Sequence, residues 1–379
     1  MKFATDMTKG ILGAPDSTVL WTDIISQIPD AVLLKPGVRI LNVAAGHGTE
    51  ALILAKRMLS LGVSKEQVNE SIYLIDKYRV FTNYLKNSYG FKNVITADFL
   101  ELETDMKFDV VVGNPPYQGK AALHQQFFNK SIELLCDEGY LAFIQPATPY
   151  FNKKSRKKSD DQMMIDNIVK YQSDVTIVDN SAFEGAAIAT DLAVTVLCKK
   201  EGDGRVKSIK YKSGVDYQNV SIQDINMMGM DPKIYRSIVS KYKKYIHSNG
   251  SLNDIVSHNE HEHKANISKL RGHGSSNPDF YTFIPVDQHE RFNPRLDFGI
   301  KAKTPKEAEH IYDYLRSYVA RMGLAILKFN TNQHMGELRV VPLVDFSKTY
   351  SDDDLFKMIG LTKPEITAIK GVISNYYDR

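Results

Sequence analysis

Four consecutive residues, Asn114-Pro115-Pro116-Tyr117, carry the clearest chemical signal in this sequence. Asn114 offers a side-chain carbonyl as a hydrogen-bond acceptor, and Tyr117 offers an aromatic face. The two prolines stiffen the backbone, so the Pro115 carbonyl can be held outward as a second acceptor. An amino group on a planar base needs this set, with one acceptor for each N–H and a surface on which the base can stack.

The chemistry predicted for this motif is methyl transfer to a planar nitrogen. The lone pair of an exocyclic amino group is delocalised into the ring, so the group is a poor nucleophile. Acceptors that bind both N–H groups draw the nitrogen toward tetrahedral geometry and free the lone pair. Transfer from a sulfonium donor then depends on alignment and electrostatics more than on a strong base, which suits the neutral Asn114. The alternative is a proline-rich turn without chemistry.

The elements around the motif favour the chemical interpretation. Residues 108–113 are an apolar run ending in glycine, so we expect a buried strand with the motif at its carboxyl end, where ligands bind in open α/β sheets. Residues 38–58 predict a strand, a turn of small residues and an amphipathic helix. Such a turn lets a ligand approach the backbone and the free N–H groups of the helix, but it lacks the third glycine of a nicotinamide site.

Two aspartates lie at the ends of further predicted strands. Asp76 ends residues 71–76, and a carboxylate there could accept both hydroxyls of a ribose. Asp98 could accept from the amino group of a cofactor adenine, with Phe99 against the adenine ring. Either aspartate alone would be equally typical of a helix or turn cap. Their order along the chain favours a shared cofactor site.

In this order the motifs resemble those of S-adenosylmethionine-dependent DNA adenine-N6 methyltransferases of the gamma group and the restriction-modification type. The resemblance implies a Rossmann-like class I methyltransferase α/β sheet, followed by an α+β target-recognition domain. It implies that Ala44, Gly46 and Gly48 line S-adenosyl-L-methionine, and that Asp76, Asp98 and Phe99 bind its ribose and adenine. Asn42 stands where many relatives carry an acidic residue and is a further cofactor candidate.

The same resemblance implies a flipped adenine as the substrate. Asn114, Pro115 and Tyr117 would hold it, Pro116 would lie beside it, and Phe183 would pack on its far face. Double-stranded DNA is the expected partner, with a cognate restriction endonuclease as a possible second one. Residues 10–29 resemble the segment that closes over the cofactor methionine, although Ala14-Pro15 replaces the usual Thr-Pro. Residues 340–366 resemble the tail of some restriction-modification methylases.

The predicted organisation is a catalytic domain over residues 1–203, a target-recognition domain over 204–345 and a helical tail over 346–379. A turn-rich, charged stretch at 201–205 suggests the first boundary. The middle segment contains loops rich in Arg, Asn, His and Tyr, which suit base and phosphate contacts. A basic run follows a predicted strand end and is either a solvated loop or a DNA contact; its charged residues are Lys153, Lys154, Arg156, Lys157 and Lys158.

Composition agrees with an ordinary soluble protein. The chain has 379 residues, 43% hydrophobic and 25% charged, and its net charge of +3 leaves room for local positive charge on a DNA enzyme. We expect Cys136 and Cys198 to be small buried hydrophobes without a disulfide, which suits a reducing compartment. The sequence shows no signal peptide or membrane-spanning run, so we expect a cytoplasmic protein without a membrane partner. The histidine cluster 258–263 fits a polar loop better than zinc, and no metal is expected.

Three other functions remain open from the sequence. An RNA adenine-N6 methyltransferase and a protein-glutamine N5 methyltransferase both share the Asn-Pro-Pro-Tyr motif, because each acts on a planar nitrogen. A non-catalytic nucleic-acid-binding module would not need the turn and the motif together. The size of the middle segment and the methylase-like tail favour DNA, by resemblance.

Overall fold

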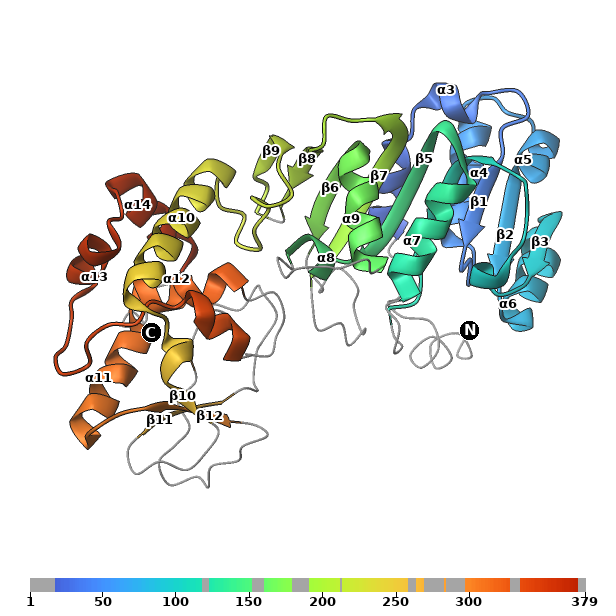
Figure 1. Ribbon diagram of the computed structural model, residues 1–379. Coiled ribbons are helices and arrows are strands. Elements are labelled where there is room, and N and C mark those ends of the chain that lie inside the picture. Colours follow the sequence, from blue (N-terminus) through green and yellow to red (C-terminus); the bar gives the residue numbers. More distant parts are fainter. Residues whose placement is uncertain are drawn as a thin grey trace. The chain divides into compact units, whose positions relative to one another are not determined.

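The chain folds into two compact units (Figure 1). The first comprises residues 1–149 and 154–222, and the second comprises residues 150–153 and 223–379. The computed structural model describes residues 18–117, 123–151, 160–178, 191–211, 213–257, 264–268, 283, 297–327 and 335–373.

The first unit is built on a nine-stranded, mostly parallel sheet with the order β3-β2-β1-β4-β5-β7-β6-β8-β9. Strands β1 to β5 are mutually parallel, and β7 is antiparallel to both β5 and β6. This arrangement confirms the predicted class I methyltransferase sheet. The strands are β1 (Ile40–Val43), β2 (Ile72–Asp76), β3 (Asn93–Thr96), β4 (Phe108–Gly113), β5 (Leu135–Pro146), β6 (Tyr171–Val178), β7 (Leu192–Glu201), β8 (Val206–Lys210) and β9 (Asp216–Val220).

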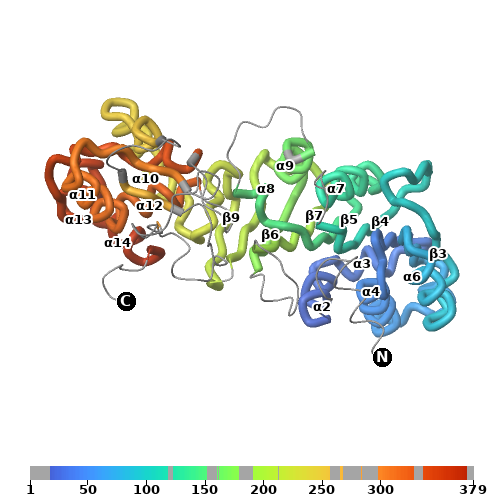
Figure 2. The backbone as a smooth tube through the Cα atoms, turned by 90° about the horizontal axis from the view of Figure 1, so that it is seen from below, coloured from blue at the N-terminus to red at the C-terminus, as the bar shows by residue number. Residues whose placement is uncertain are grey.

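Helices cover both faces of this sheet, which explains why its central strands are buried throughout. Every residue of β1 and β4 is buried, as expected for parallel strands packed on both sides. Helices α7 and α9 lie on one face, and α2 and α4 lie on the other (Figure 2). The helices are α2 (Thr18–Ser26), α3 (Asp30–Leu33), α4 (Thr49–Ser60), α5 (Lys65–Ser71), α6 (Arg79–Tyr84), α7 (Leu123–Leu134), α8 (Thr148–Phe151) and α9 (Asp160–Lys170).

The sheet continues beyond the domain boundary expected at residue 203. Strand β8 pairs with β6 in parallel, and β9 pairs with β8 in antiparallel fashion. Val206 and Ile209 of β8 are fully buried, so this hairpin shares the core of the first unit. The unit therefore runs to residue 222.

The two cysteines are free, in agreement with the absence of a predicted disulfide. Both side chains are partly exposed, so the expectation that they are buried hydrophobes was wrong. Cys136 lies near the start of β5 and Cys198 near the end of β7, where both strands change between buried and exposed positions.

The second unit combines helices with a small antiparallel sheet, as the predicted α+β class requires. The sheet has the order β10-β12-β11. Helix α10 contacts α13 and α14, so residues beyond 346 are part of this unit and not a separate tail. The elements are α10 (Pro232–Asn249), β10 (Val256–Ser257), β11 (Lys264–Ser268), β12 (Asp297–Lys301), α11 (Pro305–Arg316), α12 (Tyr318–Leu327), α13 (Asp352–Ile359) and α14 (Lys363–Val372).

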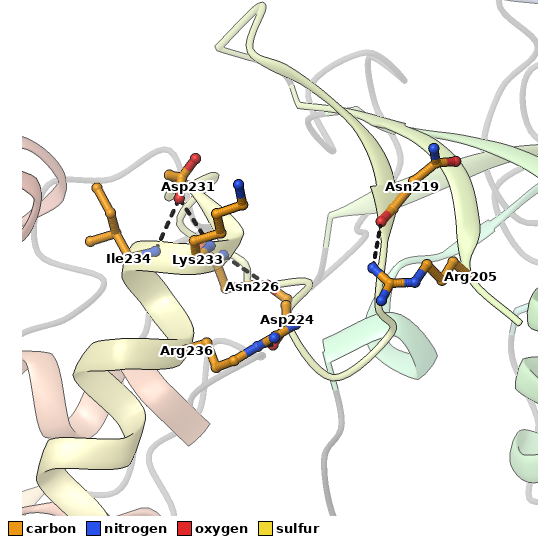
Figure 3. A network of polar contacts seen from close by, with 8 residues as sticks. All are labelled: Arg205, Asn219, Asp224, Asn226, Asp231, Lys233, Ile234 and Arg236. Carbon is orange, nitrogen blue, oxygen red and sulfur yellow. Dashed lines mark hydrogen bonds and ion pairs between the residues drawn. The ribbon is translucent and has the colours of Figure 1, made fainter.

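Polar contacts near residues 224–236 fix the start of α10 (Figure 3). Asp231 caps the helix by accepting from the backbone N–H groups of Lys233 and Ile234, at 2.9 and 3.0 Å. The guanidinium of Arg236, one turn into the helix, donates twice to the buried carboxylate of Asp224. These contacts set where the helix begins and tie it to the segment before it.

A buried carboxylate links α10 to α14. Ser237 Oγ and Lys241 Nζ of α10 each donate to Glu365 of α14 over 2.6 Å, and the backbone N–H of Thr362 donates as well. Burial opposes ionisation of this carboxyl group, but the hydrogen bonds from Lys241 and Ser237 outweigh it and lower the pKa of Glu365 to about 2. Glu365 therefore stabilises the folded second unit in its ionised form.

This link predicts a specific loss of stability at low pH. Because the folded-state pKa lies below the usual value of 4.5, the contribution is complete above pH 4.5 and is lost as the pH falls toward 2. We expect E365Q to lower stability by roughly 3 kcal/mol at neutral pH and to flatten the acid limb of the stability–pH curve. Denaturant unfolding followed by far-ultraviolet circular dichroism measures this, with the exposed Glu309 as the matched control (E309Q). If the acid limb of E365Q were as steep as that of the wild type, the stabilising role of ionised Glu365 would be contradicted.

Candidate active site

The candidate site lies at the carboxyl ends of three adjacent strands. Strand β1 lies between β2 and β4, and Val43 at its end is in register with Ile75 of β2 and Gly113 of β4. The small-residue turn follows β1, Asp76 ends β2, and Asn114 follows β4. The order of the strands reverses at β1 and β4, which is where open α/β sheets bind ligands. The structure thus brings the three predicted motifs to one edge.

The turn after β1 has a backbone that favours glycine. Ala44, Gly46 and Gly48 have φ values of 50°, 49° and 81°, which lie in the left-handed region. Gly48 is also the N-cap of α4, so the turn ends at the free N–H groups of a helix. A Cβ atom on Gly48 would lie 2.5 Å from Leu85 Cδ2. An alanine at position 48 would therefore be strained in its backbone and would also force the Leu85 side chain to shift.

A glycine-to-alanine pair separates these two effects. Gly90 has a similar φ of 73°, but a Cβ atom added there would meet no heavy atom of the described residues within 4 Å. We expect G90A to cost about 1 kcal/mol for the left-handed backbone alone, and G48A to cost roughly a further 1–3 kcal/mol for crowding against Leu85. Fluorescence of Trp21, the single tryptophan of the chain, follows unfolding of the first unit. Equal losses in the two variants would contradict the crowding.

Asp76 is tied to the turn by hydrogen bonds. Its Oδ2 accepts from the backbone N–H of Gly46 at 2.9 Å, and its Oδ1 accepts from that of Tyr78 at 2.8 Å. Only 4% of the residue is exposed, and burial raises the pKa of Asp76, although the two N–H groups favour its ionised form. Each oxygen keeps a second lone pair for a ligand hydroxyl.

Asn42 fits a cofactor site through an unused acceptor. The side chain is fully buried in β1, and its Nδ2 donates to the Val112 carbonyl at 3.4 Å. Within the described part of the chain, its Oδ1 has no hydrogen-bond partner. A buried acceptor without a partner costs about 1–3 kcal/mol, so a donor on a bound ligand would relieve a real penalty. Together with the turn and Asp76, Asn42 supports a site for a polar cofactor.

Asp98 and Phe99 have structural roles that the sequence left open or missed. Asp98 Oδ1 accepts from the backbone N–H of Leu100 at 2.9 Å and caps a short 3₁₀ helix, Phe99–Glu101. Phe99 is 2% exposed, and its ring lies 5.0 Å from that of Phe127, measured between centroids. Phe127 is itself buried. The aromatic surface expected at Phe99 is thus packed on a neighbouring ring.

The Asn-Pro-Pro-Tyr loop leaves β4 with an internal hydrogen bond. The hydroxyl of Tyr117 donates to Oδ1 of Asn114, the acceptor that the sequence assigns to an amino group. Pro115 is buried, whereas Asn114, Pro116 and Tyr117 are partly exposed. Tyr117 also packs against the hydrophobic core of the first unit. The hydrogen bond orients the Asn114 carbonyl and leaves one lone pair on its oxygen.

His124 is a candidate site residue that the sequence analysis did not identify. It lies in the first turn of α7, and its ring meets that of Tyr117 edge to face, at 6.4 Å between centroids. The residue is 7% exposed, and burial lowers the pKa of His124 to about 4, so the imidazole is neutral near pH 7. Neither ring nitrogen has a hydrogen-bond partner in the described part of the structure. Spacing alone does not distinguish such a histidine from an ordinary core residue.

Several predicted residues lie outside the described residues. The expected base-stacking residue and the basic run belong to this group, as do the Ala-Pro pair and the histidine cluster: Phe183, Lys153, Lys154, Arg156, Lys157, Lys158, Ala14, Pro15 and 258–263. Among the helices that the structure describes, none combines the length and the apolar character needed to cross a bilayer.

Comparison with known proteins finds similarity to methyltransferases over part of the first unit. A family model described as Eco57I restriction-modification methylase matches residues 47–177, which include the Asn-Pro-Pro-Tyr loop. The chain is also 28% identical over 130 residues to a tRNA1(Val) (adenine(37)-N6)-methyltransferase from a Flavobacteriaceae bacterium (strain 3519-10). That alignment covers 30% of this chain and 54% of the relative, so the chain spans about half the length of the curated protein it matches.

Solved structures similar to the chain include the M protein of the type I restriction enzyme EcoKI and TrmN from Thermus thermophilus. The first is 12% identical, covers 54% of this chain and 49% of its own, and has a TM-score of 0.41. The second is 17% identical, covers 51% of each chain, and has a TM-score of 0.35.

The first unit thus has the sheet of the class I methyltransferase fold, with the candidate site at the edge where such sheets bind ligands. The family match confirms that this domain resembles the restriction-modification methylases, as the order of the motifs predicts.

Proposed function

We propose that this protein transfers a methyl group from S-adenosylmethionine to N6 of an adenine flipped out of duplex DNA. The observation that carries the proposal is the position of Asn114 and Tyr117 at the end of β4, beside the turn that Asp76 holds. A neutral acceptor and an aromatic ring at the carboxyl edge of a parallel sheet suit an amino nucleophile better than an acid or a hydroxyl. The restriction-modification family match over the same residues supports DNA as the substrate.

The first unit supplies the groups that would hold the cofactor. Ala44, Gly46 and Gly48 allow close approach of the ligand, and the carboxylate of Asp76 would accept from the ribose hydroxyls. The Oδ1 of Asn42, which has no partner among the described residues, would accept from a further donor of the ligand, and Asp98 would contact its adenine. When bound, S-adenosylmethionine supplies an electrophilic methyl group on sulfur.

The loop after β4 would prepare the nucleophile. Asn114 Oδ1 and the Pro115 carbonyl would each accept one N–H of the target amino group, which localises the nitrogen lone pair. Tyr117 would stack on one face of the base, with Pro116 beside it and Phe183 on the other face. Extruding the base costs a few kcal/mol, which stacking and these hydrogen bonds would offset. The proton released from the methylated nitrogen would pass to water.

The remaining proposed roles concern DNA. The second unit would recognise the target sequence, and the basic run that contains Lys153, Lys154, Arg156, Lys157 and Lys158 would contact phosphates. A restriction endonuclease with the same recognition sequence would be the natural partner, and the cytoplasm the natural location.

A second candidate function is methylation of adenine N6 in structured RNA. It is favoured by the tRNA adenine-N6 methyltransferase among the relatives. Both substrates present the same amino group, so the geometry of Asn114 and Tyr117 does not separate them. The difference lies in the nucleic acid around the base.

The test is a competition among substrates. The protein is incubated with S-adenosylmethionine labelled in its methyl group and with unmethylated plasmid DNA, unmodified transfer RNA or a mixed protein fraction. We expect label in the DNA. Label that appears mainly in transfer RNA would replace the proposal by the second candidate, and label in protein alone would overturn both.

A further inference from the structure

The hydroxyl of Tyr117 and the proposed target amino group require the same acceptor. In the structure, the hydroxyl donates to Oδ1 of Asn114. On the proposed function, that oxygen must accept from the amino group of the base. A carbonyl oxygen can accept two hydrogen bonds, but sharing it with a hydroxyl weakens what it offers to the substrate. The hydroxyl therefore benefits from a second acceptor to which it can turn.

His124 lies where it could provide such an acceptor. Its ring is the edge-to-face neighbour of Tyr117, and the residue is more than nine-tenths buried. A neutral imidazole carries one N–H donor and one acceptor nitrogen. Neither is used by any group in the described part of the chain. Buried polar atoms of this kind are rare in folded proteins, and a partner that arrives during function would satisfy them.

We propose that His124 is a positioning residue that accepts the Tyr117 hydroxyl when the target amino group takes Oδ1 of Asn114. The inference rests on the proposed function and extends it. Before the base enters, the hydroxyl orients the Asn114 carbonyl; after entry, the imidazole holds the tyrosine ring in place for stacking. The low pKa of His124 keeps its acceptor nitrogen unprotonated throughout the neutral range.

A double-mutant cycle tests this exchange. With unmethylated plasmid DNA as substrate, we expect H124F to lower kcat/KM about tenfold, the usual effect of losing one neutral hydrogen bond. Y117F keeps the stacking ring and removes the competing hydroxyl, so it serves as the second background of the cycle whatever its own activity. In the Y117F background, H124F should then cause no further loss. A role of His124 in packing alone would give the same loss in both backgrounds and would overturn the proposal.

A matched tyrosine serves as the control. Tyr140 on β5 is partly buried in the same unit and lies outside the candidate site, beside Cys198. H124F should keep its full effect in a Y140F background. Unfolding followed by Trp21 fluorescence shows whether each variant folds. If H124F does not fold, H124N replaces it. Its polar Asn side chain is then expected to rescue activity. A loss of about tenfold in H124N that also occurs in the Y117F background would overturn the proposal.

A spectroscopic measurement tests the exchange without relying on turnover. In protein labelled with ¹⁵N in its imidazoles, we expect 2′-deoxyadenosine to move the signal of the unprotonated His124 nitrogen upfield, and to leave it unmoved in Y117F. An equal shift in both proteins, or no shift in either, would overturn the proposal. Wild type that methylates no substrate at all would instead overturn the proposed function, and the ¹⁵N signal would still decide the exchange.

Discussion

Replacing Asn114 by alanine is expected to lower turnover about a thousandfold, because the transition state loses the acceptor that localises the nitrogen lone pair. Affinity for S-adenosylmethionine should change little, since the substitution leaves the proposed cofactor-binding residues Asp76, Gly46 and Asn42 in place. Single-turnover rates with saturating cofactor measure the first effect, and calorimetric titration with the cofactor measures the second.

The control for this variant is another asparagine of the same sheet. Asn93 at the start of β3 donates to the carbonyls of Asn69 and Glu70. N93A should therefore turn over at close to the wild-type rate. If N114A retained turnover within about tenfold of wild type, the amino group would not depend on Asn114.

Replacing Asp76 by asparagine is expected to weaken S-adenosylmethionine binding by about 10- to 100-fold. The change removes the charge that ribose hydroxyls would meet. It also leaves one of the two backbone N–H groups, of Gly46 or Tyr78, facing an amide nitrogen instead of an acceptor oxygen. The turn should loosen as well, so the dissociation constant should rise more than kcat falls. Titration of the cofactor measures the effect.

Asp109 offers a matched control for the loss of a buried carboxylate. It lies at the opposite end of β4 and accepts from the Arg39 backbone at 2.9 Å and from Lys35 Nζ at 2.5 Å. D109N should lower stability without changing cofactor affinity. Equal weakening of cofactor binding in D76N and D109N would show that the effect is a general loosening of the sheet and not a loss of ribose contacts.

The arrangement of the site was predictable from the sequence because each motif ends an apolar strand. The run 108–113 ends in glycine, and its buried strand delivers Asn114 to the carboxyl edge. Asp76 ends a similar run, and the alternation of strands and helices predicts parallel neighbours. Parallel order then brings the two motifs together with the turn after β1.

Other features depend on tertiary contacts that local patterns do not contain. Strands β8 and β9 carry polar residues and follow a charged turn, so they looked like the start of a new domain. Phe99 follows a strand-end aspartate and could equally face a ligand or the core; its neighbour Phe127 lies far along the chain, on another helix, and decides the outcome. His124 gained meaning only from its contact with Tyr117.

The most direct test of the adenine pocket is the identity of the methylated nucleoside. Unmethylated plasmid DNA is incubated with wild type or N114A and with labelled S-adenosylmethionine, digested to nucleosides and separated. A pocket built by Asn114 and Tyr117 for adenine predicts N6-methyladenine as the labelled product of the wild type, and about a thousandth as much from N114A. Label in a methylated cytosine, or equal N6-methyladenine from both proteins, would contradict it.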